Sequence, residues 1–350
     1  MMTLPRHIYF LAPEDPHPRG GINVIFDFVE LLNAHGRSAS VHFQSSDFFY
    51  RFHDGGVRTT YSLYRDSEYG VLSHLRTRME VWRRKDPISR RAGCNELLIP
   101  GDQDIIVVPE YWYLETKPWI AGFRHVILGQ DVVGMIRGVF QPISNGMELP
   151  DTCLGFITTS KAGSEAVSAF YNGANYHVPL FINDQTFAFQ AEKSRTICFL
   201  PRKRKADATF MASLIRNRPE LASYTVKPIA NVTSRELRKI MAESLFFLSF
   251  SSNEGFGLPP AEAMAMGCIT IGYRGVGGNE YFTRDVGFPI PEDDFVAFYR
   301  TIIEVVEEYE VNSTRLECMR QTASKSILST YTKNRTTKAL LGAFDRLFLR

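Results

Sequence analysis

The feature that most constrains the fold is a repeated alternation of short apolar runs with amphipathic helical segments. HIYFLA at 7–12 is followed by a turn-rich loop, and residues 22–36 then carry apolar side chains at helical spacing. SASVHF at 38–43 returns to a strand pattern. Strand, loop, helix and strand in this order form the repeating unit of a parallel sheet.

The same alternation continues along the chain and is interrupted once. Further strands are expected at 104–111, 124–131, 155–160, 196–201, 223–229, 245–250 and 269–273. Further helices are expected at 161–173, 206–216, 234–244, 295–310 and 333–348. Periodicity is lost at 181–195, which favours a domain boundary there.

We therefore predict an α/β protein with two doubly wound Rossmann-like domains that face each other across a cleft. The N-terminal domain is expected over 1–185 and the C-terminal domain over 186–332, with a last helix in 333–350 that can pack back on the first domain. In such sheets ligands bind beyond the carboxyl ends of the strands.

Composition places the chain among folded proteins of ordinary charge. It has 350 residues, 44% of them hydrophobic and 22% charged, with a net charge of +2. Its five cysteines are odd in number, lie far apart and form no CxxC pair, which is typical of a reducing compartment. The first apolar run is too short for a signal peptide, and no window approaches the ~18 apolar residues of a membrane span. We expect a cytoplasmic protein whose membrane contact, if any, is peripheral at the inner face.

The stretch EGFGLPPAE at 254–262 lies between an expected buried strand and an expected helix stop at Gly267. Glu254 is then in the loop at the carboxyl end of the strand. Glu262 falls in the first turns of a short helix that a proline opens, where a missing N–H costs little. Both carboxylates can face one crevice.

Glycines beside the aromatic residue of this stretch give it a second property. Gly255 and Gly257 leave backbone amides accessible around Phe256. Amides donate to oxygens and carboxylates accept from hydroxyls, so a sugar and a ribose fit the pattern. The alternative is that Glu262 only complements a helix N-terminus, worth roughly 0.3–1 kcal/mol, and that Glu254 is a solvated loop residue.

A basic run follows the strand at 196–201. Arg202, Lys203, Arg204 and Lys205 are consecutive, and four cations at a strand end can neutralise a diphosphate through charge-assisted hydrogen bonds. The alternative is a solvated surface loop.

The stretch EGFGLPPAEAMAMGC resembles the signature of retaining nucleotide-sugar glycosyltransferases of the GT-B fold, of the family 4-like group 1. The segments VPLFINDQTF, PRKRK and GVGGNE come in the order that this family shows. The resemblance implies a nucleotide-sugar donor held mainly by the C-terminal domain. It implies that Glu254 holds hydroxyls of the transferred sugar, that Glu262 holds the ribose, and that Phe256, Gly257 and Leu258 offer backbone contacts.

The resemblance also implies roles for the cations and a reaction class. Arg202 matches the family's arginine, and its lysine corresponds to Lys203 or Lys205; these groups would stabilise the leaving diphosphate. The sugar would pass, with retention and by front-face attack, to a glycan or lipid-linked acceptor in cell-surface polysaccharide or glycoconjugate synthesis. No cofactor besides the donor is expected. The histidines are scattered without ligand spacing, so no metal is expected either.

Candidates for the acceptor side come from the N-terminal half. Glu110, Tyr111, Gln130 and Asp131 end two apolar strands and are expected in the cleft. The pair at 20–21, Gly20 and Gly21, opens the first helix, so its amides can touch the donor, although a plain turn is the alternative.

The basic segment 74–91 meets either an anionic lipid surface or solvent, as an ordinary exposed helix. Nucleic acid is not expected, because no broad basic surface with stacking aromatic residues is present. An NAD-linked oxidoreductase would need GxGxxG, which PRGGIN lacks. A sugar-epimerising or phosphorolytic enzyme lacks support, and a catalytically inactive nucleotide-sugar-binding module of the same fold stays open.

Overall fold

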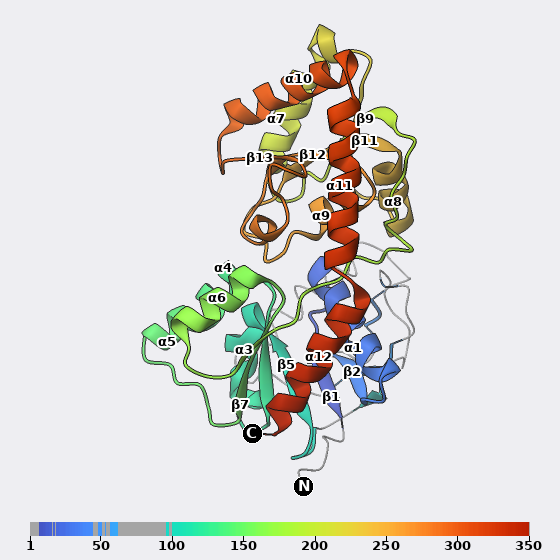
Figure 1. The fold of residues 1–350 in the computed structure, drawn as a ribbon. Helices are drawn as coiled ribbons and strands as arrows, with labels where there is room; N and C mark the ends of the chain where they lie inside the picture. Colours follow the sequence, from blue (N-terminus) through green and yellow to red (C-terminus); the bar gives the residue numbers. More distant parts are fainter. Residues whose placement is uncertain are drawn as a thin grey trace.

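The computed structural model contains two parallel sheets, each with its own helices, stacked one above the other in Figure 1. It describes residues 7–15, 17, 19–44, 48–50, 53, 57–61, 96–97 and 100–349. The basic segment 74–91 lies outside the described residues, so its prediction is not tested. Among the helices of the described ranges, none combines the length and the apolar character that a bilayer span requires.

The first sheet has the strand order β4-β3-β2-β1-β5-β6-β7-β8, all pairs parallel. Its strands are β1 (Ile8–Leu11), β2 (Ala39–Phe43), β3 (Thr59–Tyr61), β4 (Glu96–Leu97), β5 (Ile105–Pro109), β6 (His125–Gly129), β7 (Cys153–Thr158) and β8 (Asn175–His177). The helices between them are α1 (Gly20–Ala34), η1 (Glu110–Trp112), α3 (Tyr113–Ile120), α4 (Val132–Met135), the π-helix η2 (Ile136–Phe140), α5 (Gln141–Ser144) and α6 (Lys161–Phe170). The four central strands are buried on both faces, as expected for a parallel sheet covered by helices.

The second sheet has the order β10-β9-β11-β12-β13 and is also parallel. Its strands are β9 (Ser194–Phe199), β10 (Thr225–Pro228), β11 (Ser244–Phe250), β12 (Ile269–Tyr273) and β13 (Phe288–Ile290). Its helices are α7 (Lys205–Arg216), η3 (Pro219–Leu221), α8 (Ser234–Glu243), α9 (Leu258–Ala265), η4 (Gly277–Glu280), α10 (Phe295–Val311) and α11 (Thr314–Thr330). The chain passes from the first sheet to the second between residues 177 and 194.

The last two helices connect the halves. In Figure 1 α11 runs along the second sheet, and α12 (Lys333–Phe348) continues onto the first half. There α12 packs on α1, β7 and β8, and the hydroxyl of Thr336 donates to the carbonyl of Pro179 at 2.8 Å. Phe256 and Tyr331 belong to the same apolar cluster as the strands of the first sheet. One apolar cluster therefore spans the contact between the two halves.

Buried polar contacts fix the segment between the halves to the second one. Arg320 of α11 is 4% exposed and donates to the carbonyls of Gln190 (2.9 Å), Ala191 (2.6 Å) and Gly267 (3.3 Å). It also pairs with Glu317 at 2.7 Å. A guanidinium has five N–H donors, so one side chain can satisfy all of these acceptors.

Candidate functional site

The stretch 254–262 forms the loop and short helix that the sequence predicts. β11 ends at Phe250, and α9 begins at Leu258 with a proline in its first two positions. Gly257 is the N-cap with φ of +84°, a left-handed conformation that glycine adopts without strain. Its carbonyl accepts a hydrogen bond from the buried hydroxyl of Tyr281. This hydrogen bond stabilises the turn that carries the backbone amides.

Glu254 lies at the carboxyl end of β11, as expected. Its side chain is 14% exposed, with one oxygen 4.0 Å from Nη2 of Arg202 and 3.9 Å from Nζ of Lys203. Burial raises the pKa of the Glu254 carboxyl, Lys203 and Arg202 oppose that rise, and the charge of Asp131 adds to it. The acid and the start of the basic run therefore face each other, although they are far apart in sequence.

These side chains border one hollow at the carboxyl ends of the strands. It is lined by Leu200, Arg202, Lys203, Phe247, Leu248, Ser249, Phe250, Ser251, Glu254, Pro259 and Pro260. Lys205 is not among the lining residues; it is the exposed first residue of α7. Of the two lysines left open by the sequence, Lys203 is the one that the structure brings to Glu254.

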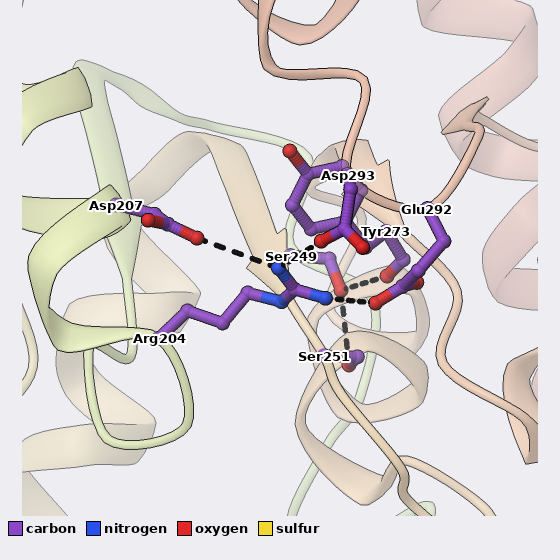
Figure 2. Close-up of polar contacts among 7 residues, drawn as sticks. All are labelled: Arg204, Asp207, Ser249, Ser251, Tyr273, Glu292 and Asp293. Carbon is purple, nitrogen blue, oxygen red and sulfur yellow. Dashed lines mark hydrogen bonds and ion pairs between the residues drawn. The ribbon is translucent and has the colours of Figure 1, made fainter.

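Arg204 departs from the expectation of four free cations. Figure 2 shows its guanidinium directed at three acids: it lies 2.6 Å from Asp293 and 3.4 Å from Asp207, and it also pairs with Glu292. It stacks over the ring of Tyr273, 4.8 Å from the centroid. The positive charge of Arg204 is already neutralised within the protein, so the basic run offers fewer cations to a ligand than its sequence predicts.

Glu262 is the fifth residue of α9 and lies beyond its first turn. The stabilisation of acids by a helix N-terminus falls off within the first turn, so that alternative explanation of Glu262 is not supported. Burial raises the pKa of Glu262 to about 7; Arg238 opposes the rise, and the charges of Asp27 and Glu254 add to it. The two acids of the stretch thus influence each other electrostatically, but Glu254 lines the hollow beside Arg202 and Lys203 and Glu262 does not.

Phe256 has a structural side chain. It is 3% exposed and packs against the rings of Tyr281 and Tyr331 at 5.1 and 4.9 Å. Only its backbone is available for a ligand, as the family resemblance implies. Leu258 lies at the contact between the halves, since a β-carbon on Gly20 would be 3.4 Å from its Cδ1.

Gly20 and Gly21 are the first two residues of α1, whose N-cap Arg19 provides no side-chain cap. The side-chain amide of Gln130 donates through Nε2 to the carbonyl of Gly21 at 3.2 Å. The start of α1 therefore lies beside both Gln130 and the donor stretch. The first N–H groups of a helix have no intrahelical partner and suit an anion.

The acceptor-side prediction for Glu110 is wrong as to its position. Glu110 is 1% exposed, and its carboxylate accepts the backbone N–H groups of Gln130 (3.1 Å) and Asp131 (3.0 Å). Burial raises the pKa of Glu110 to about 8, the N–H of Gln130 opposes the rise, and the charge of Asp131 adds to it. Tyr111, by contrast, is 50% exposed, and Gln130 and Asp131 are partly exposed. The position of Glu110 after a strand predicts a carboxylate in the cleft. The sequence cannot show that two backbone N–H groups already bind this carboxyl group.

Further contacts join the two halves beside the site. Glu280, in the segment GVGGNE, accepts the N–H of Lys161 at the start of α6 at 3.3 Å.

In the described part of the chain, one group of potential metal ligands was missed by sequence spacing: Asp27, Glu30 and His53 each place an atom within 4.8 Å of the others. His53 is hydrogen-bonded to Asp27 at 3.1 Å, which a histidine and an acid do without a metal.

Comparison with known proteins agrees with this geometry. Residues 221–324, which include the donor stretch, match the family profile described as glycosyl transferases group 1. Residues 221–324 are thus similar to group 1 glycosyl transferases.

Curated relatives extend this similarity over part of the chain. An alpha-1,6-glucosyltransferase of Actinobacillus pleuropneumoniae is 32% identical over 129 residues, which are 34% of this chain and 38% of the relative. A putative glycosyltransferase of a Sulfolobus islandicus filamentous virus is 42% identical over 69 residues, 19% of this chain and 20% of the relative. The matches thus span well under half the length of these relatives.

Solved structures are similar in fold to almost the whole length of the chain. Sucrose-phosphate synthase from Thermosynechococcus elongatus has a TM-score of 0.67 at 13% identity, covering 98% of this chain and 99% of that chain. Staphylococcus aureus TarM, solved with fondaparinux, alpha-GlcNAc-glycerol and UDP, has a TM-score of 0.67 at 10% identity, covering 99% and 100%. Anabaena HepE with UDP and glucose has a TM-score of 0.63 at 12% identity, covering 97% and 100%. The predicted GT-B fold, with two Rossmann-like domains, is confirmed.

Proposed function

We propose that the protein transfers a sugar from a nucleotide-sugar donor to a glycan or lipid-linked acceptor, in the synthesis of cell-surface polysaccharide or glycoconjugate. The observation that carries the proposal is the shared hollow of Arg202, Lys203 and Glu254, in which two cations and one partly buried acid converge at the strand ends. TarM and HepE, which share the fold, were solved with UDP and a sugar compound. A diphosphate beside the cations and a sugar beside the acid fit this arrangement.

Arg202 and Lys203 would stabilise the leaving diphosphate. Negative charge grows on that group as the glycosidic bond to it breaks, so fixed cations lower the barrier more than they stabilise the ground state. Lys203 replaces Lys205 in this role because it lines the hollow. The chain's own cations supply the positive charge, and we propose that the reaction needs no metal.

Glu254 would accept hydrogen bonds from hydroxyls of the transferred sugar. Glu262 would do the same for the ribose, and the backbone at Gly255, Gly257 and Leu258 would donate to donor oxygens. The start of α1 at Gly20 lies against Leu258, so its free amides would approach the donor from the other domain.

We infer front-face attack with retention of configuration, in which the donor phosphate helps to take the acceptor's proton. The acceptor would enter beside Tyr111, Gln130 and Asp131. Glu110 is not part of that surface, since its carboxylate is buried. We place the reaction in the cytoplasm, where nucleotide sugars are available, with peripheral contact to a membrane that holds a lipid-linked acceptor.

A thermal-shift screen of UDP, GDP, ADP, CMP and TDP sugars would test the donor class. A ligand at 100 times its dissociation constant should stabilise the protein by ~2.7 kcal/mol. The donor that binds would then be used in transfer assays, with the anomeric configuration of the product read by proton NMR. Retention is expected. Binding without transfer to any glycan or lipid-linked acceptor would instead indicate an inactive binding module.

Glu254→Ala should reduce transfer at least tenfold, about 1.4 kcal/mol in barrier, while the circular dichroism spectrum stays that of the wild type. Glu304→Ala, an exposed change on α10, is the matched control and should keep full activity. Full activity of Glu254→Ala would remove the sugar-holding role of this residue.

A further inference from the structure

The buried carboxylate of Glu110 has a use that the proposed reaction does not assign. It lies at the carboxyl end of β5 as the first residue of η1, and it is 1% exposed. Its two oxygens each accept one backbone N–H: Oε2 from Gln130 at 3.1 Å and Oε1 from Asp131 at 3.0 Å. Both bonds go to consecutive residues of the loop after β6. The two oxygens of the carboxyl group therefore fix the conformation of that loop.

The packing around Glu110 leaves no approach for a ligand. A β-carbon on Gly134 would lie 3.0 Å from Oε1 of Glu110, and one on Gly138 would lie 2.4 Å from its carbonyl oxygen. The helices α4 and η2 thus pack closely on η1, and the close approach is made at Gly134 and Gly138. Asp131 adds to the rigidity of the loop, because its side chain accepts the N–H of Gly134 and caps α4. The loop is held from both of its ends.

The other side of this loop touches the opposite domain. A β-carbon on Gly255 would lie 1.5 Å from the carbonyl oxygen of Gln130 and 3.1 Å from Cα of Asp131. The charge of Asp131 also acts on the Glu254 carboxyl. A further backbone contact lies behind, since a β-carbon on Gly277 would be 1.8 Å from the carbonyl oxygen of Gly255. Loop and donor stretch are in direct backbone contact.

We propose that Glu110 is a positioning residue that fixes the loop Gln130–Asp131 against Gly255 and thereby sets the acceptor side relative to the donor sugar. The expected effect on the rate of transfer rests on the proposed function. The expected effect on the conformation of the loop does not. Glu110 would act through the loop and touch neither substrate. Its loss should slow transfer without weakening the binding of a nucleotide, which Arg202 and Lys203 hold on the other domain.

Amide hydrogen exchange of the full chain tests the structural part without any activity. Glu110→Gln keeps the size of the side chain but replaces one acceptor oxygen by a donor, so one of the two N–H groups loses its partner. We expect at least tenfold faster exchange at residues 130–131 and faster exchange at 254–256. Asp104→Asn is the matched control: this buried acid at the other end of β5 accepts the N–H of Gly101 at 2.8 Å, and its change should leave both segments unaffected. Unchanged exchange in Glu110→Gln would overturn the proposal.

Steady-state kinetics tests the consequence. Glu110→Gln should lower kcat at least tenfold and change the Kd of UDP, the probe for nucleotide binding, less than twofold. Gly255→Ala should reduce kcat similarly, and the double variant should lose less than the product of the two effects, because both act on one contact. A UDP affinity that falls as far as kcat, or fully multiplicative effects, would contradict positioning through the loop. Absence of transfer even in the wild type would refute the proposed function alone, since the exchange experiment would still decide the role of Glu110.

Discussion

Gly255 lies directly against the backbone carbonyl of Gln130, in the other domain, with no room for a β-carbon between them. The first glycine of the donor stretch is therefore required by a contact between domains. Gly257, two residues on, is required for another reason, because its φ is +84°. The two glycines look equivalent in the sequence and have different physical tasks.

Gly255→Ala should displace the loop at Gln130 or open the domains. A methyl group placed 1.5 Å from a carbonyl oxygen forces backbone movement, and overpacking of this kind costs about 1–3 kcal/mol. We expect unfolding in denaturant to show a loss of that size, and transfer to fall at least tenfold. Gly122→Ala has no atom within 4 Å of the new methyl group and should change neither quantity.

The basic loop predicts a graded effect on nucleotide binding. Charge-assisted hydrogen bonds contribute about 1.5–3 kcal/mol, so Arg202→Ala and Lys203→Ala should each weaken the binding of a nucleoside diphosphate by about tenfold or more. Lys205→Ala should change the affinity less than twofold, because Lys205, unlike Arg202 and Lys203, does not line the hollow. Isothermal titration calorimetry measures all three. A larger effect from Lys205 than from Lys203 would exchange their roles.

The raised pKa of Glu262 predicts that the free energy of unfolding depends on pH. Its pKa is raised to about 7 by burial, with Arg238 opposing and Asp27 and Glu254 adding to the rise. Between pH 4.5 and 7 the folded state holds more of this proton than the unfolded state, so the free energy of unfolding falls as pH rises. Glu262→Gln should flatten this slope in urea titrations, whereas Glu304→Gln on the surface of α10 should preserve it. An identical slope in wild type and Glu262→Gln would show that Glu262 does not contribute.

The hydrogen bonds and the ion pair of Arg320 predict that its substitution, away from the site, lowers the stability of the protein strongly. Its removal takes a buried partner away from the carbonyls of Gln190, Ala191 and Gly267 and from Glu317, and breaking a buried ionic network costs about 3–5 kcal/mol. Arg320→Ala should therefore lower the denaturation midpoint strongly. Arg346→Ala, on the exposed face of α12, is the control with an expected effect within about 0.5 kcal/mol. A small effect of Arg320→Ala would mean that solvent replaces its bonds.

The sequence predicts well the parts of the fold that depend on local patterns. β11, α9 with its early proline and the helix stop at Gly267 follow from apolar runs, proline and glycine, and Gly267 has φ of +79°. The sequence pattern does not indicate α11, because the buried face of this helix includes Arg320 and Ser324 and its apolar stripe is correspondingly weak. The short edge strands β8 and β13 were also missed, since three residues carry little periodicity.

The site could be predicted only in part, because partners distant in the chain decide the role of a charge. Arg202 and Glu254 were named from their positions at strand ends, and the structure brings them together. Arg204 looks identical to its neighbours in sequence, but Glu292 and Asp293 neutralise it from a loop almost ninety residues away. Glu110 likewise follows a strand as expected, yet backbone amides occupy its carboxylate.

A crystal structure with a bound nucleoside diphosphate would decide whether these residues form the donor site. We predict diphosphate density beside Arg202 and Lys203, with the ribose hydroxyls within hydrogen-bond distance of Glu262 and the sugar position next to Glu254. A nucleotide bound elsewhere, with those side chains left in contact only with one another and with solvent, would contradict it.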